Sequence, residues 1–102
     1  MIRFKFIKYG EFLGTRQLGE KVRNELMPLI MSGDKVILDF SGVKVVAHSF
    51  ADECIGKLLL EMPLEELKQR TTFQGLDDLA KRHIVIAFRR RLESLAPSVS
   101  ST

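Results

Sequence analysis

The chain has 102 residues, 45% of them hydrophobic and 28% charged, which fits one globular domain that can bury a core of its own. The chain has 16 Lys and Arg against 13 Asp and Glu, and this net charge of +3 is only a mild basic excess. It is not the dense basic stripe that makes nucleic acid a favoured partner. No apolar run reaches the roughly 20 residues that span a membrane, and the single Cys54 excludes an internal disulfide, so we expect a cytoplasmic protein without membrane contact.

The N-terminal third predicts a strand followed by a helix. Residues 3–9 alternate in a pattern of period two that is typical of a strand, and Gly10 marks its end. Thr15 is the predicted N-cap of the helix, whose apolar stripe runs through residues 18–30 at spacings of three and four. Pro28 lies inside that stripe, so we expect either a kink or a break there.

Two extended segments follow this helix. Gly33 is its expected left-handed C-cap. Residues 35–40 are short, apolar and β-branched between turn residues, which predicts a buried central strand, and residues 43–46 form a second extended piece.

The clearest pattern in the chain predicts a helix that ends at Pro63. Its apolar residues recur in pairs every four positions and form a buried stripe, made of Phe50, Ala51, Cys54, Ile55, Leu58, Leu59 and Met62. The residues assigned to the opposite, polar face are Asp52, Glu53, Gly56, Lys57 and Glu61. Ser49 is the predicted N-cap, and Asp52 is the acid of a capping box. Gly56 either allows another backbone to approach closely or is simply tolerated at a cost of about 1 kcal/mol relative to Ala.

The C-terminal third predicts a helical turn at residues 64–69 and a strand at residues 71–75. Residues 84–88 fit a strand by residue type, but helical spacing extends from residue 76 to residue 88 and favours a helix. Three i,i+4 ion pairs support that helix, namely Asp77–Lys81, Asp78–Arg82 and Arg89–Glu93. Residues 97–102 are expected to form a flexible tail after a single domain at residues 1–96.

The alternation of strands and helices predicts an α/β fold. We expect a small mixed or largely parallel sheet of about four strands with helices packed against it.

Two motifs stand close together in the middle of the chain. Asp39–Val43 reads Asp-Phe-Ser-Gly-Val at the end of a strand, and Ser49–Glu53 reads Ser-Phe-Ala-Asp-Glu at the start of a helix. This segment resembles the strand–loop–helix core of STAS domains of the anti-sigma-factor-antagonist type. It is more similar still to the STAS-like family of unknown function, whose other motifs match Gly14-Thr15-Arg16, the strand beginning at Val36 and the basic run Arg89–Arg91. The resemblance covers residues 10–93.

This resemblance implies a βαβα arrangement with a partner-binding surface at the strand–helix junction. In STAS antagonists, a partner serine kinase with an ATP-binding fold phosphorylates the first serine of Asp-Ser-Ser-Gly. Here Ala47 replaces the acid, His48 replaces that serine and Phe50 replaces the glycine, while Ser49 matches the second serine. The resemblance therefore implies docking on an ATP-binding kinase or ATPase, with Ser49 as the remaining candidate for modification.

The reactive residue types near this junction have simpler structural interpretations. Ser49 serves either as a cap alone or as a phosphorylation site that would add about two negative charges. His48 is interpreted as a rim residue and His83 as half-buried core, and together with Cys54 they lack the spacing of metal ligands. Because no nucleophile-elbow or phosphate-binding motif occurs either, we predict no enzyme activity, cofactor or metal site.

The sequence thus predicts a non-catalytic interaction module that binds another protein. The predicted partner-binding residues are His48, Ser49, Asp52, Glu53, Gly56 and Lys57. Nucleic-acid binding is the alternative, through a basic surface of Lys81, Arg82, Arg89, Arg90 and Arg91, although these side chains spread around their helix. A homo-oligomer that pairs through the edge strand at residues 3–9 is a third hypothesis, against which Arg3, Lys5 and Lys8 look like edge protection.

Overall fold

A sheet of three parallel strands forms one layer of the protein. The computed structural model describes residues 1–95. The strands are β1 (Ile2–Lys5), β3 (Val36–Asp39) and β5 (Thr71–Gln74), with β3 in the centre. The register pairs Leu38 with Phe4 on one side and with Phe73 on the other. Two further parallel strands, β2 (Phe12–Leu13) and β4 (Val45–Val46), form a separate small sheet. The predicted tail at residues 97–102 lies outside the described residues.

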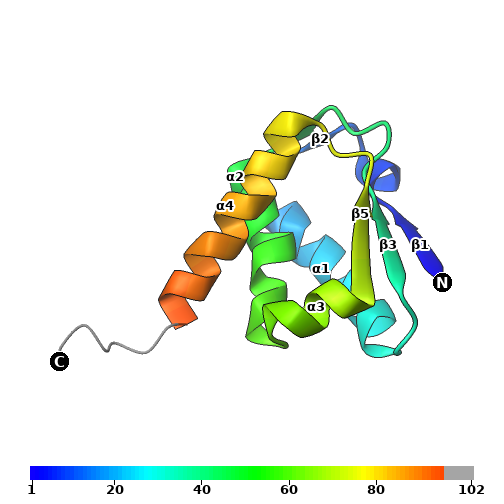
Figure 1. Cartoon of the computed structure of the whole chain (residues 1–102). Helices are drawn as coiled ribbons and strands as arrows, with labels where there is room; N and C mark the ends of the chain where they lie inside the picture. Colours follow the sequence, from blue (N-terminus) through cyan, green and yellow to red (C-terminus); the bar gives the residue numbers. More distant parts are fainter. Residues whose placement is uncertain (96–102) are drawn as a thin grey trace, which may run out of the picture.

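Helices form the second layer. They are α1 (Arg16–Met31), α2 (His48–Phe50), α3 (Leu64–Arg70) and α4 (Asp78–Leu95). In Figure 1, α2, α3 and α4 lie to the left of β1, β3 and β5, and the end of α1 passes behind β5. α2 continues directly into a π-helical segment, η2 (Ala51–Ile55), and then into a 3-10 segment, η3 (Gly56–Leu60). We call residues 48–60 the central helix, because it packs against α1 and also against α4. Within residues 1–95, no helix combines the length and the apolar character needed to cross a membrane.

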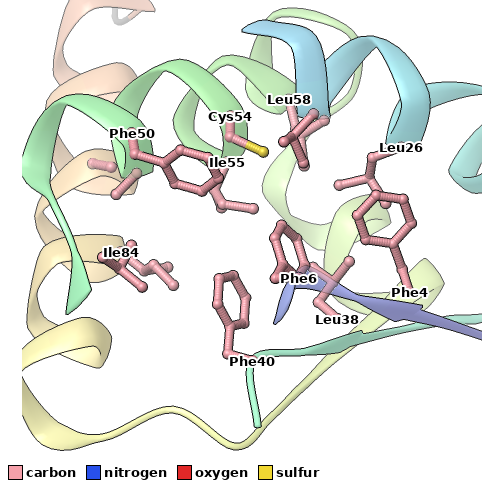
Figure 2. Close-up of a cluster of buried hydrophobic side chains, with 14 of the residues drawn as sticks. Phe4, Phe6, Leu26, Leu38, Phe40, Phe50, Cys54, Ile55, Leu58 and Ile84 are labelled. Carbon is pink, nitrogen blue, oxygen red and sulfur yellow. The ribbon is translucent and has the colours of Figure 1, made fainter. Parts of the chain in front are cut away.

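Aromatic side chains fill the space between the two layers (Figure 2). The Phe6 and Phe40 rings stack with their centroids 3.9 Å apart, and the Phe50 ring meets Phe6 edge-on at 6.4 Å. Every apolar residue predicted for the buried stripe of the central helix is buried, so that prediction is confirmed. Each large side chain of this kind contributes roughly 1.5–3 kcal/mol by leaving water, so the stripe of the central helix is a substantial part of the core.

The first strand is shorter than predicted. It ends at Lys5, so the prediction of a strand up to residue 9 is wrong. Residues Phe6–Tyr9 form a 3-10 turn, η1, instead. A continued strand would place Tyr9 on the face opposite Phe4, because strand side chains alternate. The turn instead brings the Tyr9 ring against Phe4, with centroids 6.0 Å apart, and lets the Tyr9 hydroxyl donate to Glu25.

The predicted ends of α1 are confirmed. The Thr15 hydroxyl oxygen accepts a hydrogen bond from the Leu18 amide at 3.1 Å, as an N-cap does. The helix continues past Pro28 to Met31, so there is no break, and Gly33 follows with a positive φ of 97°.

The α/β class is confirmed, but the sheet differs from the single sheet of about four strands that was expected. The five strands divide into two parallel sheets, with three strands in one and two in the other. Residues 84–88 are helical, as favoured. None of the three predicted ion pairs of α4 forms within residues 1–95; the Asp77 carboxylate instead accepts from the Ala80 amide at 2.8 Å and caps the helix.

α1 crosses the central helix at Gly19, a contact that the sequence patterns do not reveal. A Cβ atom at Gly19 would lie 2.9 Å from the Glu53 Cβ and 3.2 Å from the Phe50 carbonyl oxygen. The two helices are therefore closer here than any larger residue would allow.

We expect Gly19→Ala to lower the free energy of unfolding by about 1–3 kcal/mol, because overpacking exceeds the gain of about 1 kcal/mol in helix propensity. Urea unfolding measures this change. The matched control is Gly14→Ala, where a Cβ meets no atom within 4 Å. A Gly19→Ala protein as stable as the wild type would show that this close contact is not present.

Candidate partner-binding site

The central helix begins two residues earlier than predicted. Ala47 has extended backbone angles and is the N-cap, and its carbonyl accepts the Ala51 amide at 2.9 Å. Ser49 is already inside the helix, where its hydroxyl donates to the Gly14 carbonyl at 3.2 Å. The predictions of Ser49 as N-cap and Asp52 as capping-box acid are therefore wrong, because β4 ends at Val46 and only Ala47 separates it from the first helical turn.

The STAS-like motif at the end of β3 is held by its own hydrogen bonds. The Asp39 carboxylate accepts from the Ser41 amide at 2.9 Å and from Arg3 on β1 at 3.0 Å. The bonds from Ser41, with a further contribution from Arg3, hold the pKa of Asp39 below its ordinary value. Gly75 packs directly on this turn, since a Cβ there would lie 2.5 Å from the Ser41 nitrogen. Asp39 thus shapes the loop that leads to β4.

His48 and His83 lie ring to ring beside the junction. Their centroids are 3.6 Å apart, and His83 Nδ1 lies 2.6 Å from the Val46 carbonyl oxygen. Because a carbonyl only accepts, Nδ1 of His83 must carry the hydrogen. Partial loss of hydration, followed by the charges of His83 and Arg90, lowers the pKa of His48. His48 is exposed and His83 is half-buried, as predicted.

Asp52 joins three helices. Arg91 of α4 donates to both of its carboxylate oxygens, at 2.9 and 2.7 Å, and Arg16 of α1 donates to one of them at 2.8 Å. Burial alone would raise the pKa of Asp52, but the hydrogen bonds from Arg91 and Arg16 outweigh it and keep the pKa below its ordinary value. The paired, charge-assisted geometry with Arg91 is the stronger kind of ion pair.

Glu53 is the most deeply buried acid of the central helix. Its carboxylate accepts from Arg23 at 2.7 Å and from Lys57 at 2.9 Å, and Arg23 also donates to the Glu53 carbonyl. Burial alone would raise the pKa of Glu53, but these hydrogen bonds lower it below its ordinary value. We call this network the ion-pair cluster; its members are Arg16, Arg23, Asp52, Glu53, Lys57 and Arg91.

The predicted exposed face of the central helix is therefore wrong at two of its positions. Glu53 is 5% exposed, and Gly56 is buried against Ala87 and the Arg91 side chain of α4. Lys57 is half-buried with its ammonium group on Glu53. α1 and α4 cover this part of the polar face, where their cationic side chains neutralise its carboxylates, so Glu53 and Gly56 are not on the surface.

An apolar pair that the sequence did not indicate is exposed beside the junction. Phe12 of β2 is 64% exposed and Val45 of β4 is 43% exposed, and the two residues are partners in the strand register. The chain continues from Val45 to the exposed His48 within three residues. We call Phe12, Val45 and His48 the junction surface. The only sequence signal for Phe12 is its place in a two-residue apolar run between glycines, which also fits a buried strand.

The predicted basic surface does not form one patch. Arg91 points to Asp52 inside the ion-pair cluster, and Arg90 carries the charge that acts on His48. Lys81 and Arg89 line a groove on another side of α4. These side chains are therefore distributed around the helix, as their spacing predicted.

The comparison with protein families identifies the chain. The model of the STAS-like domain of unknown function (DUF4325) matches residues 18–81, and the protein belongs to this family. The matched span covers most of α1, all of the central helix and β5. The comparisons with curated proteins and with solved structures give no match.

We expect Glu53→Gln to lower the free energy of unfolding by roughly 3 kcal/mol, because the change leaves partly buried cations without their charge partner. Chemical unfolding in urea measures the loss. Glu65→Gln is the control, since Glu65 is exposed and its pair with Lys68 at 3.9 Å is worth less than about 1 kcal/mol. Equal stability of the two variants would contradict the assignment of Glu53 to the interior.

Proposed function

We propose that this protein is a non-catalytic interaction module that docks on a regulatory protein through the junction surface. The observation that carries the proposal is the exposure of Phe12 and Val45 side by side in the strand register. Single exposed apolar residues are common on proteins, but an aromatic and a β-branched side chain together resemble the anchor of an interface.

The surroundings of the junction surface support this role. Ser49 is tied to Gly14 just after β2, and Arg16 on the following helix is tied to Asp52. Both links join the segment that carries Phe12 to the helix that carries His48. A surface that is already ordered loses less conformational entropy when a partner binds.

The family resemblance suggests the partner. Docking at this strand–helix junction on an ATP-binding serine-kinase-like protein or ATPase is what the STAS-like motifs imply. His48 stands at the position of the phosphorylated serine, so the junction surface would serve for docking without that switch. Phosphorylation of Ser49 would have to break its bond to Gly14 and would bring negative charge next to Asp52.

Nucleic-acid binding is less well supported. Arg91 is hydrogen-bonded to Asp52, whereas Lys81 and Arg89 line a groove and Arg90 lies near His48. A polyanion would therefore meet no continuous row of cations.

The test titrates this protein by calorimetry with serine-kinase-like ATP-binding proteins of the same organism, and failure of all of them to bind would contradict this choice of partner. We expect Phe12→Ser and Val45→Thr each to weaken its binding about tenfold, equivalent to about 1.4 kcal/mol. Leu60→Ser is the matched control, because Leu60 is similarly exposed but lies at the other end of the central helix. Equal loss of affinity in all three variants would contradict docking at the junction surface.

A further inference from the structure

An open apolar groove of about 920 Å³ is lined by residues of α4, β5 and α3. Figure 1 shows where these three elements lie. Phe73 forms part of its floor, and the Phe88 ring meets Phe73 edge-on with centroids 6.4 Å apart. Val85 and Leu92 extend the wall along α4, although Val85 is 52% exposed. Apolar surface of this extent is typical of a binding site on a soluble domain.

The groove lies where the sheet stops. Among residues 1–95, β5 is an edge strand, so the backbone groups on its outer side have no neighbouring strand in that part of the chain. The start of that edge is covered, because Thr71 donates through its amide and its hydroxyl to the Leu67 carbonyl at the end of α3. The part around Phe73 remains next to the groove. A further strand would lie about 4.8 Å from β5, beneath the exposed apolar residues of α4.

The rim of the groove is mainly cationic. Lys68, Lys81 and Arg89 line it together with a single carboxylate, Glu93. Within residues 1–95, neither Lys81 nor Arg89 has an ion-pair partner within 4.0 Å, and Lys68 has only the exposed Glu65 at 3.9 Å. Negative charge on an occupant would therefore find cations that are not already neutralised.

We propose that this groove binds an extended, acidic peptide segment of a second protein, which adds a strand to β5 and inserts alternate apolar side chains against α4. Backbone hydrogen bonds to the edge around Phe73 would align the segment, and Val85, Phe88 and Leu92 would hold its apolar side chains. Carboxylates on its outward positions would meet Lys81 and Arg89. This site lies apart from the junction surface and does not depend on it.

The experiment selects the peptide without assuming its sequence. A random 12-residue peptide library is panned on the full chain and counter-selected on the Val85→Glu/Leu92→Glu double variant, which changes only exposed positions. We expect enrichment of acidic peptides with apolar residues at alternate positions. Failure to enrich any peptide, or enrichment of basic ones, would overturn the proposal.

Fluorescence anisotropy then measures the affinity of the best peptide for single variants. We expect Val85→Glu and Lys81→Glu each to weaken binding at least tenfold. Leu79→Glu should change it less than twofold, because Leu79 lies on the same helix and is 55% exposed but does not line the groove. N-methylation of the peptide backbone should abolish binding, and unchanged affinity of the methylated peptide would exclude strand addition.

Two further measurements distinguish peptide binding in the groove from binding at the junction surface and from self-association. Phe12→Ser should leave peptide affinity unchanged. The proposal for the groove and the proposal for the junction surface are therefore tested independently. Light scattering of the free chain should not show an association that Val85→Glu abolishes. If it does, a second copy of the chain occupies the groove and the proposal is wrong.

Discussion

The arrangement of the helices depends on the carboxylates of Asp52 and Glu53. Both lie on the central helix and are bound by cations from elsewhere, Asp52 by Arg91 of α4 and Glu53 by Arg23 of α1. A buried carboxylate without such partners would cost several kcal/mol, so each helix must sit where its cation can reach. The hydrophobic core requires only that apolar faces meet. The ion-pair cluster also constrains how α1 and α4 are rotated about their axes and where they lie along the central helix.

The same constraint determines what the protein can offer to a partner. Because α1 and α4 occupy both flanks of the central helix, its carboxylates are bound inside the protein. The junction surface at the start of that helix and the groove beside α4 are both accessible. We propose the junction surface as the docking site and the groove as a separate, chemically different site for a peptide.

Much of the fold could be predicted from the sequence, because helix caps and apolar spacing are local signals. Thr15 caps α1 and the apolar stripe of the central helix is buried, as their patterns indicated. Glu53 could not be placed, since periodicity assigns a polar residue to the exterior and the neutralising Arg23 is 30 residues away. The wrong cap at Ser49 has a related origin, because the helix start depends on where β4 ends. The groove requires the relative position of β5 and α4, which no local pattern contains.

Asp52 and Arg91 join α4 to the central helix. A double-mutant cycle with Asp52→Asn, Arg91→Met and the combined variant, each unfolded in urea, measures that link most directly. We expect a coupling free energy of about 1–3 kcal/mol between the two positions. If the effects of the two single changes on the free energy of unfolding add to within about 0.5 kcal/mol, that result would contradict the link. Apolar packing alone would then determine the position of α4.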